Sequence, residues 1–127
     1  MTESKKKILI VDDEASWLEI LTAGLLSSGF RAICARNGEE GFKLALGERP
    51  DLILLDVVMP KMDGMTVMRK LREETWGKSV PIILFSSLKP NEEIMKRVSL
   101  YKPALYLVKT DCEPEDVVIK IREVLSC

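Results

Sequence analysis

The sequence contains no histidine, and its three cysteines, Cys34, Cys112 and Cys127, are widely spaced without a CxxC pair. The lack of histidine excludes Ser-His-Asp and Cys-His nucleophile systems and histidine-ligated zinc sites. The odd and dispersed set of cysteines argues against a disulfide framework. We therefore expect any chemistry to rely on carboxylates, hydroxyls, lysine or a hard cation.

A strong net charge and a long apolar run are also missing. Nineteen Lys and Arg stand against twenty Asp and Glu, so the formal charge is −1, and the cationic field that non-specific nucleic-acid or membrane binding needs is absent. The longest purely aliphatic runs, Ile8–Val11 and Leu52–Leu55, are far shorter than the about 20 residues of a membrane span. The first is also too short for a signal-peptide core. We expect a cytoplasmic protein that binds neither nucleic acid nor membrane directly.

Length and composition indicate a single folded unit. The sequence has 127 residues, of which 46% are hydrophobic and 31% charged, with seven Gly and six Pro. This balance is typical of a globular core with a solvated surface. Because domains commonly hold about 100–150 residues, we expect one domain across residues 1–127.

Short apolar runs of the length of buried strands recur at regular intervals. They are Ile8–Val11, Arg31–Ala35, Leu52–Val57, Pro81–Phe85 and Ala104–Val108. The segments between them have helical periodicity, as in Leu18, Leu21 and Leu25. Gly29 is expected to end the first helix, and Asn37, Asp63, Asn91 and Pro114 to begin the other four. The pattern predicts a strand followed by a helix, repeated five times.

The expected strands are apolar throughout rather than alternating with polar residues. Such strands are typical of a parallel sheet that is covered on both faces, and right-handed crossovers then give an α/β, doubly wound, five-stranded parallel sheet. In this fold the side chains at the carboxyl ends of the strands meet in the crevice where the strand order reverses. We therefore expect the functional site at those ends.

Acidic residues follow two of the predicted strands. Asp12 and Asp13 come after the first strand, and Asp56 lies at the end of the third. Neighbouring carboxylates repel one another unless a proton or a cation intervenes, and Mg²⁺ prefers oxygen ligands of this kind. The alternative is that Asp13 only caps the first helix and Asp12 is a solvated loop residue. The position of Asp56 favours a Mg²⁺ site.

The fourth strand is followed by Ser86 and the fifth by Lys109, which adds a hydroxyl and a cation to the same crevice. A phosphoryl group on Asp56 would find a positive charge and a hydrogen-bond donor there, which is what phosphoryl transfer requires. For Lys109 alone, the alternative is an ordinary solvated lysine. The combination predicts phosphoryl chemistry more specifically than any member does.

Four segments together resemble the receiver domain of bacterial two-component response regulators, over nearly the whole chain. They are ILIVDDE (Ile8–Glu14), PDLILLDVVMPKMDG (Pro50–Gly64), PIILFSS (Pro81–Ser87) and YLVK (Tyr106–Lys109), in the order and at the spacing of that family. The resemblance implies the flavodoxin-like (βα)5 receiver fold and a chain similar to the stand-alone, chemotaxis-type receivers.

The resemblance also implies a role for each matching residue. Asp56 would be the phosphoacceptor, taking a phosphoryl group from a sensor histidine kinase or a phosphotransfer protein. Asp12, Asp13, Asp56 and the backbone carbonyl of Val58 would hold Mg²⁺. Lys109 would contact the phosphoryl group, while Ser86 and Tyr106 would switch position on phosphorylation. Beyond its own Mg²⁺-dependent phosphorylation and autodephosphorylation, no enzyme activity is implied.

A phosphorylated receiver would act by changing a protein-binding surface. In this family that surface commonly comprises the fourth helix, the fifth strand and the fifth helix. Here it would include Lys89, Lys96, Arg97, Tyr101, Lys102 and Tyr106, a basic and aromatic set suited to an acidic downstream protein. The alternative is an ordinary solvated helix.

Three positions depart from the family pattern. Thr110 replaces a proline that commonly follows the lysine in a cis bond; because a non-proline cis bond costs roughly 3 kcal/mol, a trans bond with a displaced Lys109 is one expectation. Ser87 replaces a small alanine beside the phosphodonor path, and Lys102-Pro103 replaces Gly-Ala. These departures motivate the alternative of a pseudo-receiver that binds a partner constitutively without phosphorylation.

Two aliphatic residues stand where relatives place polar side chains that orient the hydrolytic water. They are Val58 and Leu88, and because aliphatic groups cannot orient an attacking water we expect slow autodephosphorylation. Val58 also counts against a third function, an aspartyl-phosphate hydrolase of the haloacid-dehalogenase kind, which needs a second acid two residues after the nucleophile.

Overall fold

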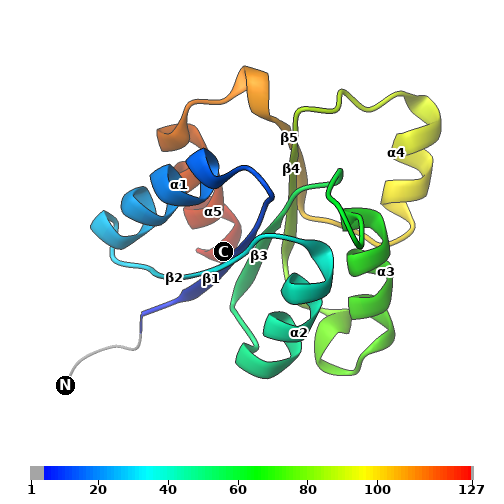
Figure 1. Ribbon diagram of the computed structural model, residues 1–127, viewed down its shortest axis with the longest axis horizontal. Coiled ribbons are helices and arrows are strands. Elements are labelled where there is room, and N and C mark those ends of the chain that lie inside the picture. The colour runs from blue at the N-terminus through cyan, green and yellow to red at the C-terminus, as the bar shows by residue number, and fades with distance from the viewer. Residues whose placement is uncertain (1–4, 127) are drawn as a thin grey trace.

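The computed structural model describes residues 5–126, so Cys127 lies outside it. Strands and helices alternate along the chain (Figure 1). The strands are β1 (Lys7–Val11), β2 (Arg31–Ala35), β3 (Leu52–Leu55), β4 (Ile82–Ser86) and β5 (Leu105–Val108). The α-helices are α1 (Ala15–Ser27), α2 (Gly38–Glu48), α3 (Gly64–Glu73), α4 (Glu92–Ser99) and α5 (Pro114–Leu125), with short 3₁₀ helices at Trp76–Lys78 and Lys109–Asp111.

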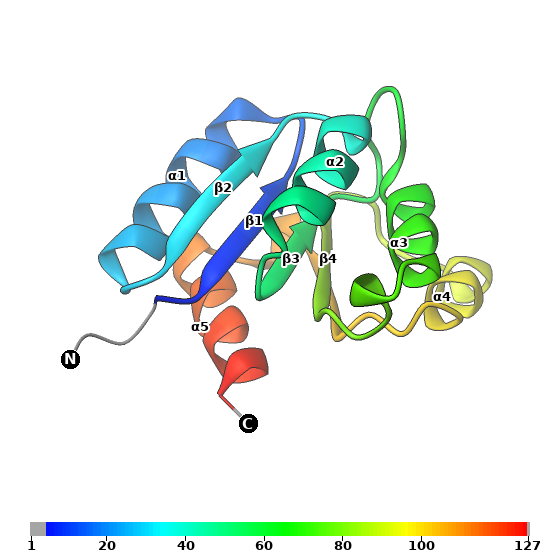
Figure 2. The ribbon, with the colours of Figure 1, turned by 90° about the horizontal axis from the view of Figure 1, so that it is seen from below.

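The five strands form one parallel sheet in the order β2-β1-β3-β4-β5. Helices α1 and α5 cover one face of it, and α2, α3 and α4 cover the other (Figures 1 and 2). The predicted doubly wound sheet is therefore confirmed. The strand order reverses between β1 and β3, which places the ends of these two strands at the mouth of a crevice.

The core consists of two layers because side chains of each strand point alternately to opposite faces. In β1, Leu9 and Val11 pack under α2 and α3, whereas Ile8 and Ile10 pack under α1 and α5. All four are at most 1% exposed. This double burial explains why the strands are apolar throughout, and it fixes the register that brings the strand ends together.

Capping residues set the helix starts as the sequence predicts. The side chains of Asn37, Asp63 and Asn91 each accept a hydrogen bond from a backbone amide in the first turn of α2, α3 and α4. Pro114 is the first residue of α5, and Gly29 follows α1 with φ +90°, a conformation that favours glycine.

The strand limits differ slightly from those predicted. β3 ends at Leu55, not at Val57, although both Asp56 and Val57 are buried. β4 runs from Ile82 to Ser86, one residue later than the predicted Pro81–Phe85. Hydrophobicity marks burial and not ladder pairing, so a buried loop after a strand is indistinguishable from the strand in the sequence.

The guanidinium of Arg72, in the last turn of α3, joins two connecting segments, the one between α3 and β4 and the one between α4 and β5. Its Nη1 donates to the carbonyls of Gly77 at 2.7 Å and Val80 at 2.8 Å. Its Nε donates to the Tyr101 carbonyl at 2.8 Å, and Nη2 to the Lys102 carbonyl at 3.3 Å. The connection from α4 to β5 is thereby anchored to α3.

Lys102 has φ +52°, in the left-handed region that glycine favours. Lys102-Pro103 stands where the resemblance implies Gly-Ala, and Lys102 adopts a backbone conformation of the kind that glycine favours although it carries a side chain.

Within residues 5–126 the longest helix, α1, has 13 residues, and no helix there is long and apolar enough to cross a membrane.

Candidate functional site

The candidate residues lie at the ends of four strands, at one edge of the sheet. Asp12 follows β1, Asp56 follows β3, Ser86 ends β4 and Lys109 follows β5. These four are also the buried polar and charged residues of the described chain, each at most 5% exposed. Because buried charges are costly unless paired, their gathering at one place indicates a functional site.

Lys109 neutralises the acidic residues directly. Its Nζ lies 2.8 Å from Asp12 Oδ2, 2.8 Å from Glu14 Oε1 and 3.0 Å from Asp56 Oδ2. Burial alone would lower the pKa of Lys109, but the hydrogen bonds it donates to Asp12 and Glu14 outweigh burial and raise that pKa above the ordinary lysine value. The lysine is therefore fully charged at neutral pH and placed to meet an anion at Asp56.

Asp12 is the most constrained of the acids. Burial raises its pKa, and the hydrogen bonds it accepts from Lys109 and from the Glu14 amide offset part of that rise. The Glu14 amide reaches Asp12 Oδ1 at 2.9 Å. The backbone after β1 is thus folded around this carboxylate.

Asp12, Asp13 and Asp56 form a candidate metal site. One carboxylate oxygen from each lies within 4.8 Å of the others. Asp12 and Asp56 are buried, whereas Asp13 is exposed, so the cluster opens to solvent on one side. Three hard oxygen donors with an open side suit a cation that keeps several waters.

The alternative that Asp13 merely caps the first helix is wrong. Glu14 occupies the cap position of α1, and no side chain hydrogen bond caps that helix. With its carboxylate free of the helix end, Asp13 is available to the acidic cluster.

Ser86 and Tyr106 both contact Leu88, in the loop between β4 and α4. The Leu88 amide donates to Ser86 Oγ at 3.2 Å, and the Tyr106 hydroxyl donates to the Leu88 carbonyl at 2.7 Å. Burial raises the pKa of Tyr106, which therefore stays a neutral donor. The two predicted switch residues are linked through one backbone segment.

The expected displacement of Lys109 does not occur. No cis peptide bond is found in the described chain, so the bond before Thr110 is trans. Lys109 begins a 3₁₀ turn, Lys109–Asp111, and its side chain still reaches Asp12 and Asp56. A trans bond before Thr110 is therefore compatible with a lysine in the site.

Val58 lies at the rim of the site. Its amide donates to Asp56 Oδ1 at 3.2 Å, and its side chain is 59% exposed. Leu88 is 36% exposed, and both residues line one surface groove. The role of the Val58 carbonyl as a metal ligand stays a prediction. The structure shows that two aliphatic side chains, Val58 and Leu88, lie at the rim of the site.

The predicted protein-binding surface is only partly exposed. Lys89, Lys96, Arg97 and Lys102 are exposed, whereas Tyr101 and Tyr106 are half-buried and pack against the core beneath α4. The exposed members of this set are therefore all basic, and its tyrosines offer only part of their rings.

Two residues of the site, each the last residue of a segment quoted for the resemblance, received no role from the sequence. Glu14 contacts Lys109, and its place directly after two aspartates was the only signal. Gly64 begins α3, where an added Cβ would overlap the Asp56 carbonyl oxygen, and its amide donates to the Val57 carbonyl at 2.8 Å. The sequence around Asp63-Gly64 contains no signal that by itself predicts this close approach of the two backbone segments.

Comparisons with known proteins point to one family. The sequence model of the family described as "Response regulator receiver domain" matches residues 8–122. The chain is 40% identical over 127 residues to "Probable transcriptional regulator ycf27" of Porphyra purpurea, covering 98% of this chain and 49% of that protein. It is 38% identical over 120 residues to "Alkaline phosphatase synthesis transcriptional regulatory protein PhoP" of Bacillus subtilis (strain 168), covering 94% and 48%. The chain thus spans about half the length of these relatives.

Solved structures show the same architecture. Chemotaxis protein CheY4 of Vibrio cholerae superimposes with a TM-score of 0.88 at 27% identity, covering 96% of this chain and 100% of that one. A chain of the CheX-CheY-BeF3-Mg²⁺ complex from Borrelia burgdorferi superimposes with a TM-score of 0.83 at 30% identity, covering 94% of this chain and 88% of that one.

Proposed function

Since this chain belongs to the response regulator receiver domain family, we propose that it works in the cytoplasm as a phosphoacceptor of a two-component system. Asp56 takes a phosphoryl group from a sensor histidine kinase or a phosphotransfer protein. The modified domain then presents an altered surface to a downstream protein. It turns over no separate substrate, since its chemistry is its own phosphorylation and autodephosphorylation.

The contact between Lys109 and Asp56 carries this proposal. Lys109 is 5% exposed and lies 3.0 Å from a buried carboxylate, and burying both charges costs desolvation free energy. Such an arrangement is useful where a further negative charge will appear, because a preorganised cation stabilises that charge without rearrangement. A phosphoryl group on Asp56 is such a charge.

The positions of the side chains support a direct transfer step. An Asp56 carboxylate oxygen attacks the phosphorus of the donor, the bond between phosphorus and the donor atom breaks, and an acyl phosphate forms. Lys109 neutralises one phosphoryl oxygen. Ser86, at the end of the neighbouring strand, donates its hydroxyl to another.

Mg²⁺ fits the acidic cluster and, when bound, would supply neutralising charge to the transferring phosphoryl oxygens. Asp12, Asp13 and Asp56 would hold it, together with the Val58 carbonyl. Asp12 and Glu14 share the Lys109 ammonium in the structure. Occupation of the cluster by a divalent ion would release that ammonium toward the phosphoryl group.

The switch would act through the loop that holds Leu88. Ser86 Oγ accepts a hydrogen bond from the Leu88 amide, and it must turn away from that amide to reach a phosphoryl group. Loss of this bond frees the loop, and Tyr106 is attached to the same residue. The surface of α4, β5 and α5 would then change shape.

The two alternatives are less favourable. The pseudo-receiver alternative rests on Thr110, Ser87 and the Lys102-Pro103 pair, yet Lys109 contacts Asp12 and Asp56 directly in spite of these departures. A hydrolase of the haloacid-dehalogenase kind would need an acid at Val58, whose exposed aliphatic side chain cannot serve as a general acid or base.

Intact mass spectrometry tests the proposal. The protein is incubated with Mg²⁺ and acetyl phosphate or phosphoramidate, beside Asp56→Asn and, as a matched control, Asp51→Asn, at a half-buried aspartate whose side chain accepts from the Lys7 amide and contacts none of the site residues. The gain of one phosphoryl group by the wild type and by Asp51→Asn, and its loss in Asp56→Asn, would support phosphorylation at Asp56. A gain that persists in Asp56→Asn would overturn the site. No gain, together with no binding of Mg²⁺ by folded protein, would favour the pseudo-receiver.

A further inference from the structure

The ammonium of Lys109 lies over an aromatic ring as well as against carboxylates. Its Nζ is 5.6 Å from the centroid of the Phe85 ring, within the about 6 Å over which a ring face attracts a cation. Phe85 is 1% exposed and Lys109 is 5% exposed. Because this attraction is stronger when the pair is shielded from water, the buried ring helps to hold the lysine.

The Phe85 ring packs against a second aromatic residue. Trp17, in the first turn of α1, meets it in a T-shaped arrangement, with the ring centroids 4.8 Å apart and the ring planes at 90°. This is a preferred geometry for aromatic pairs. Trp17 lies three residues after Glu14, whose carboxylate contacts Lys109 at 2.8 Å. The start of α1 therefore acts on the lysine twice, directly through Glu14 and indirectly through the two rings.

All three hydrogens of the Lys109 ammonium have carboxylate acceptors within reach. An ammonium has three donors, and oxygens of Asp12, Glu14 and Asp56 lie 2.8, 2.8 and 3.0 Å from Nζ. The lysine can donate to a phosphoryl group on Asp56 only if one hydrogen leaves its carboxylate. A ring face attracts the charge without accepting one of these hydrogen bonds, so its attraction persists while the partners change.

The backbone beside the lysine is less restrained than a proline would make it. Proline fixes its own φ angle, but Thr110 follows Lys109 in this chain. Lys109 also comes directly after β5, an edge strand of the sheet. The groups that surround the side chain are therefore the main restraint on the position of the ammonium.

We propose that Phe85 is a positioning residue, whose ring face holds the Lys109 ammonium in the site while the lysine changes hydrogen-bond partners. Trp17 keeps the ring in the orientation that this requires. The role rests on the proposed function, because the lysine changes partners when Asp56 takes a phosphoryl group. Phe85 has no polar side-chain atom to offer a phosphoryl oxygen, so it acts only through Lys109.

The exchange of the Lys109 ammonium hydrogens with water tests this role without a phosphodonor. It is measured by NMR on protein that contains isotope-labelled lysine, and the signal is assigned by its absence from Lys109→Met. We expect Phe85→Leu to speed the exchange by about 2- to 30-fold, the range that a cation–π contact provides. Unchanged exchange in folded Phe85→Leu would overturn the proposal.

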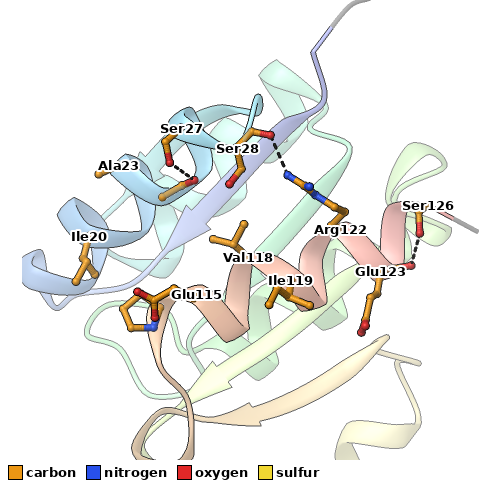
Figure 3. Close-up of a pocket in the computed structure, with 12 residues that line it drawn as sticks. Ile20, Ala23, Ser27, Ser28, Glu115, Val118, Ile119, Arg122, Glu123 and Ser126 are labelled. Carbon is orange, nitrogen blue, oxygen red and sulfur yellow. Dashed lines mark hydrogen bonds between the residues drawn. The ribbon is translucent and has the colours of Figure 1, made fainter.

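Phe30→Leu is the matched control, because it removes another ring from the same core layer. Phe30 is 8% exposed, and its ring centroid lies 5.7 Å from the guanidinium carbon of Arg122. Arg122 also donates to the Ser28 carbonyl at 3.0 Å, in a groove between α1 and α5 that is lined by none of the site residues (Figure 3). Equally fast exchange in the two leucine variants would assign the effect to a loosened core and contradict the role of Phe85.

The rate of phosphorylation by acetyl phosphate with Mg²⁺ gives a second readout. Phe85→Leu should slow it by a similar factor, whereas Phe30→Leu should not. A wild type that gains no phosphoryl group would contradict the proposed function, while the exchange comparison would still decide whether Phe85 holds the lysine. Faster exchange with an unchanged rate of phosphorylation would show that this contact does not serve the transfer.

A fluorinated ring separates attraction from packing. Trifluorophenylalanine in place of Phe85 keeps the shape of the ring but withdraws negative charge from its face, so it also replaces Phe85→Leu if that variant does not fold. We expect faster ammonium exchange and slower phosphorylation than in the wild type. Wild-type values for both would show that the ring only fills space.

Trp17→Leu tests the support of the ring. It should speed the exchange of the Lys109 ammonium hydrogens, by a smaller factor than Phe85→Leu does. Trp76→Leu is the control, because Trp76 is also half-buried but packs against the other core layer. Unchanged exchange in Trp17→Leu, or an equal rise in both tryptophan variants, would contradict the role of Trp17.

Discussion

The hydroxyl of Tyr106 donates a hydrogen bond to the backbone carbonyl of Leu88 over 2.7 Å. It connects the edge strand β5 to the loop whose amide is held by Ser86. One loop residue therefore has both of its backbone polar groups held by residues predicted to switch. This arrangement can transmit a change at Ser86 to the surface around Tyr106.

Tyr106→Phe should remove that hydrogen bond with little other change. We expect the free energy of unfolding in urea to fall by about 0.5–1.5 kcal/mol, while the phosphoryl group gained in the mass assay is kept. Tyr101→Phe is the control, because within residues 5–126 the Tyr101 hydroxyl makes no hydrogen bond. Equal losses in the two variants would show that the Leu88 contact contributes nothing.

Lys109→Met should leave Asp12 and Asp56 buried without their counter-charge. Removing one partner of a buried ion pair costs about 3–5 kcal/mol, so we expect a loss of that order in urea denaturation at neutral pH. Added Mg²⁺ should recover part of the loss, and so should a lower pH, because protonated carboxyls need no counter-charge.

Lys120→Met is the control for this variant, since Lys120 forms an exposed pair with Glu123 at 3.4 Å. Exposed pairs of this kind contribute about 0–1 kcal/mol. A Lys109→Met variant as stable as Lys120→Met would contradict the role of Lys109 as the counter-charge of the acidic cluster.

Gly64→Ala should displace the backbone that carries Asp56. The new Cβ would overlap the Asp56 carbonyl oxygen, and overpacking of this kind costs about 1–3 kcal/mol. We expect lower stability and slower phosphorylation by acetyl phosphate. Gly47→Ala has open space around its Cβ and lies within α2, so it should instead stabilise by about 0.5–1 kcal/mol. Gly64→Ala with wild-type stability would show that the backbone accommodates the methyl group.

Val58→Asn combined with Leu88→Glu should shorten the life of the phosphorylated protein. Both residues are exposed at the rim of the site, and polar groups there can orient a water that aliphatic groups cannot. General acid–base assistance contributes typically about 10²–10⁴-fold, so an acceleration of about 10-fold or more is expected when the phosphorylated mass is followed over time. A wild-type half-life of seconds that the double variant leaves unchanged would refute slow autodephosphorylation.

Arg72→Lys should loosen the connection between α4 and β5. A lysine cannot reproduce the planar set of donors that reaches four carbonyls, and each buried carbonyl left unpaired costs about 1–3 kcal/mol. The rate of backbone amide hydrogen exchange should rise in the residues around Tyr101. Arg69→Lys, which alters only an exposed pair with Glu73, should change neither stability nor exchange. Unchanged exchange in Arg72→Lys would show that the loop is held by other contacts.

Most of the fold could be predicted from local sequence patterns. The apolar runs and the capping residues Asn37, Asp63 and Asn91 predict where strands and helices lie, because burial and capping depend on neighbouring residues. The sheet edge at which Asp12 and Asp56 meet also followed, since parallel strands end together. The limits of β3 did not follow, because Val57 is buried without belonging to the strand.

Contacts between distant residues were the part that the sequence could not supply. Nothing local to Arg72 shows that its guanidinium reaches the carbonyls of Tyr101 and Lys102 about thirty positions later. The contact of Glu14 with Lys109 spans 95 positions. Such pairings depend on how complete elements pack, and a single sequence contains no signal for them.

The separation of the acidic cluster from its counter-charge has a consequence for synthesis of the chain. Asp12, Asp13 and Asp56 have all been made one residue after the end of β3, whereas Lys109 comes 53 residues after Asp56, beyond the edge strand β5. Until that strand joins the sheet, the growing chain has gathered negative charge with no lysine to offset it. We therefore expect the acidic ends of β1 and β3 to come together fully only after β5 has joined the sheet, or earlier where a cation such as Mg²⁺ offsets their charge.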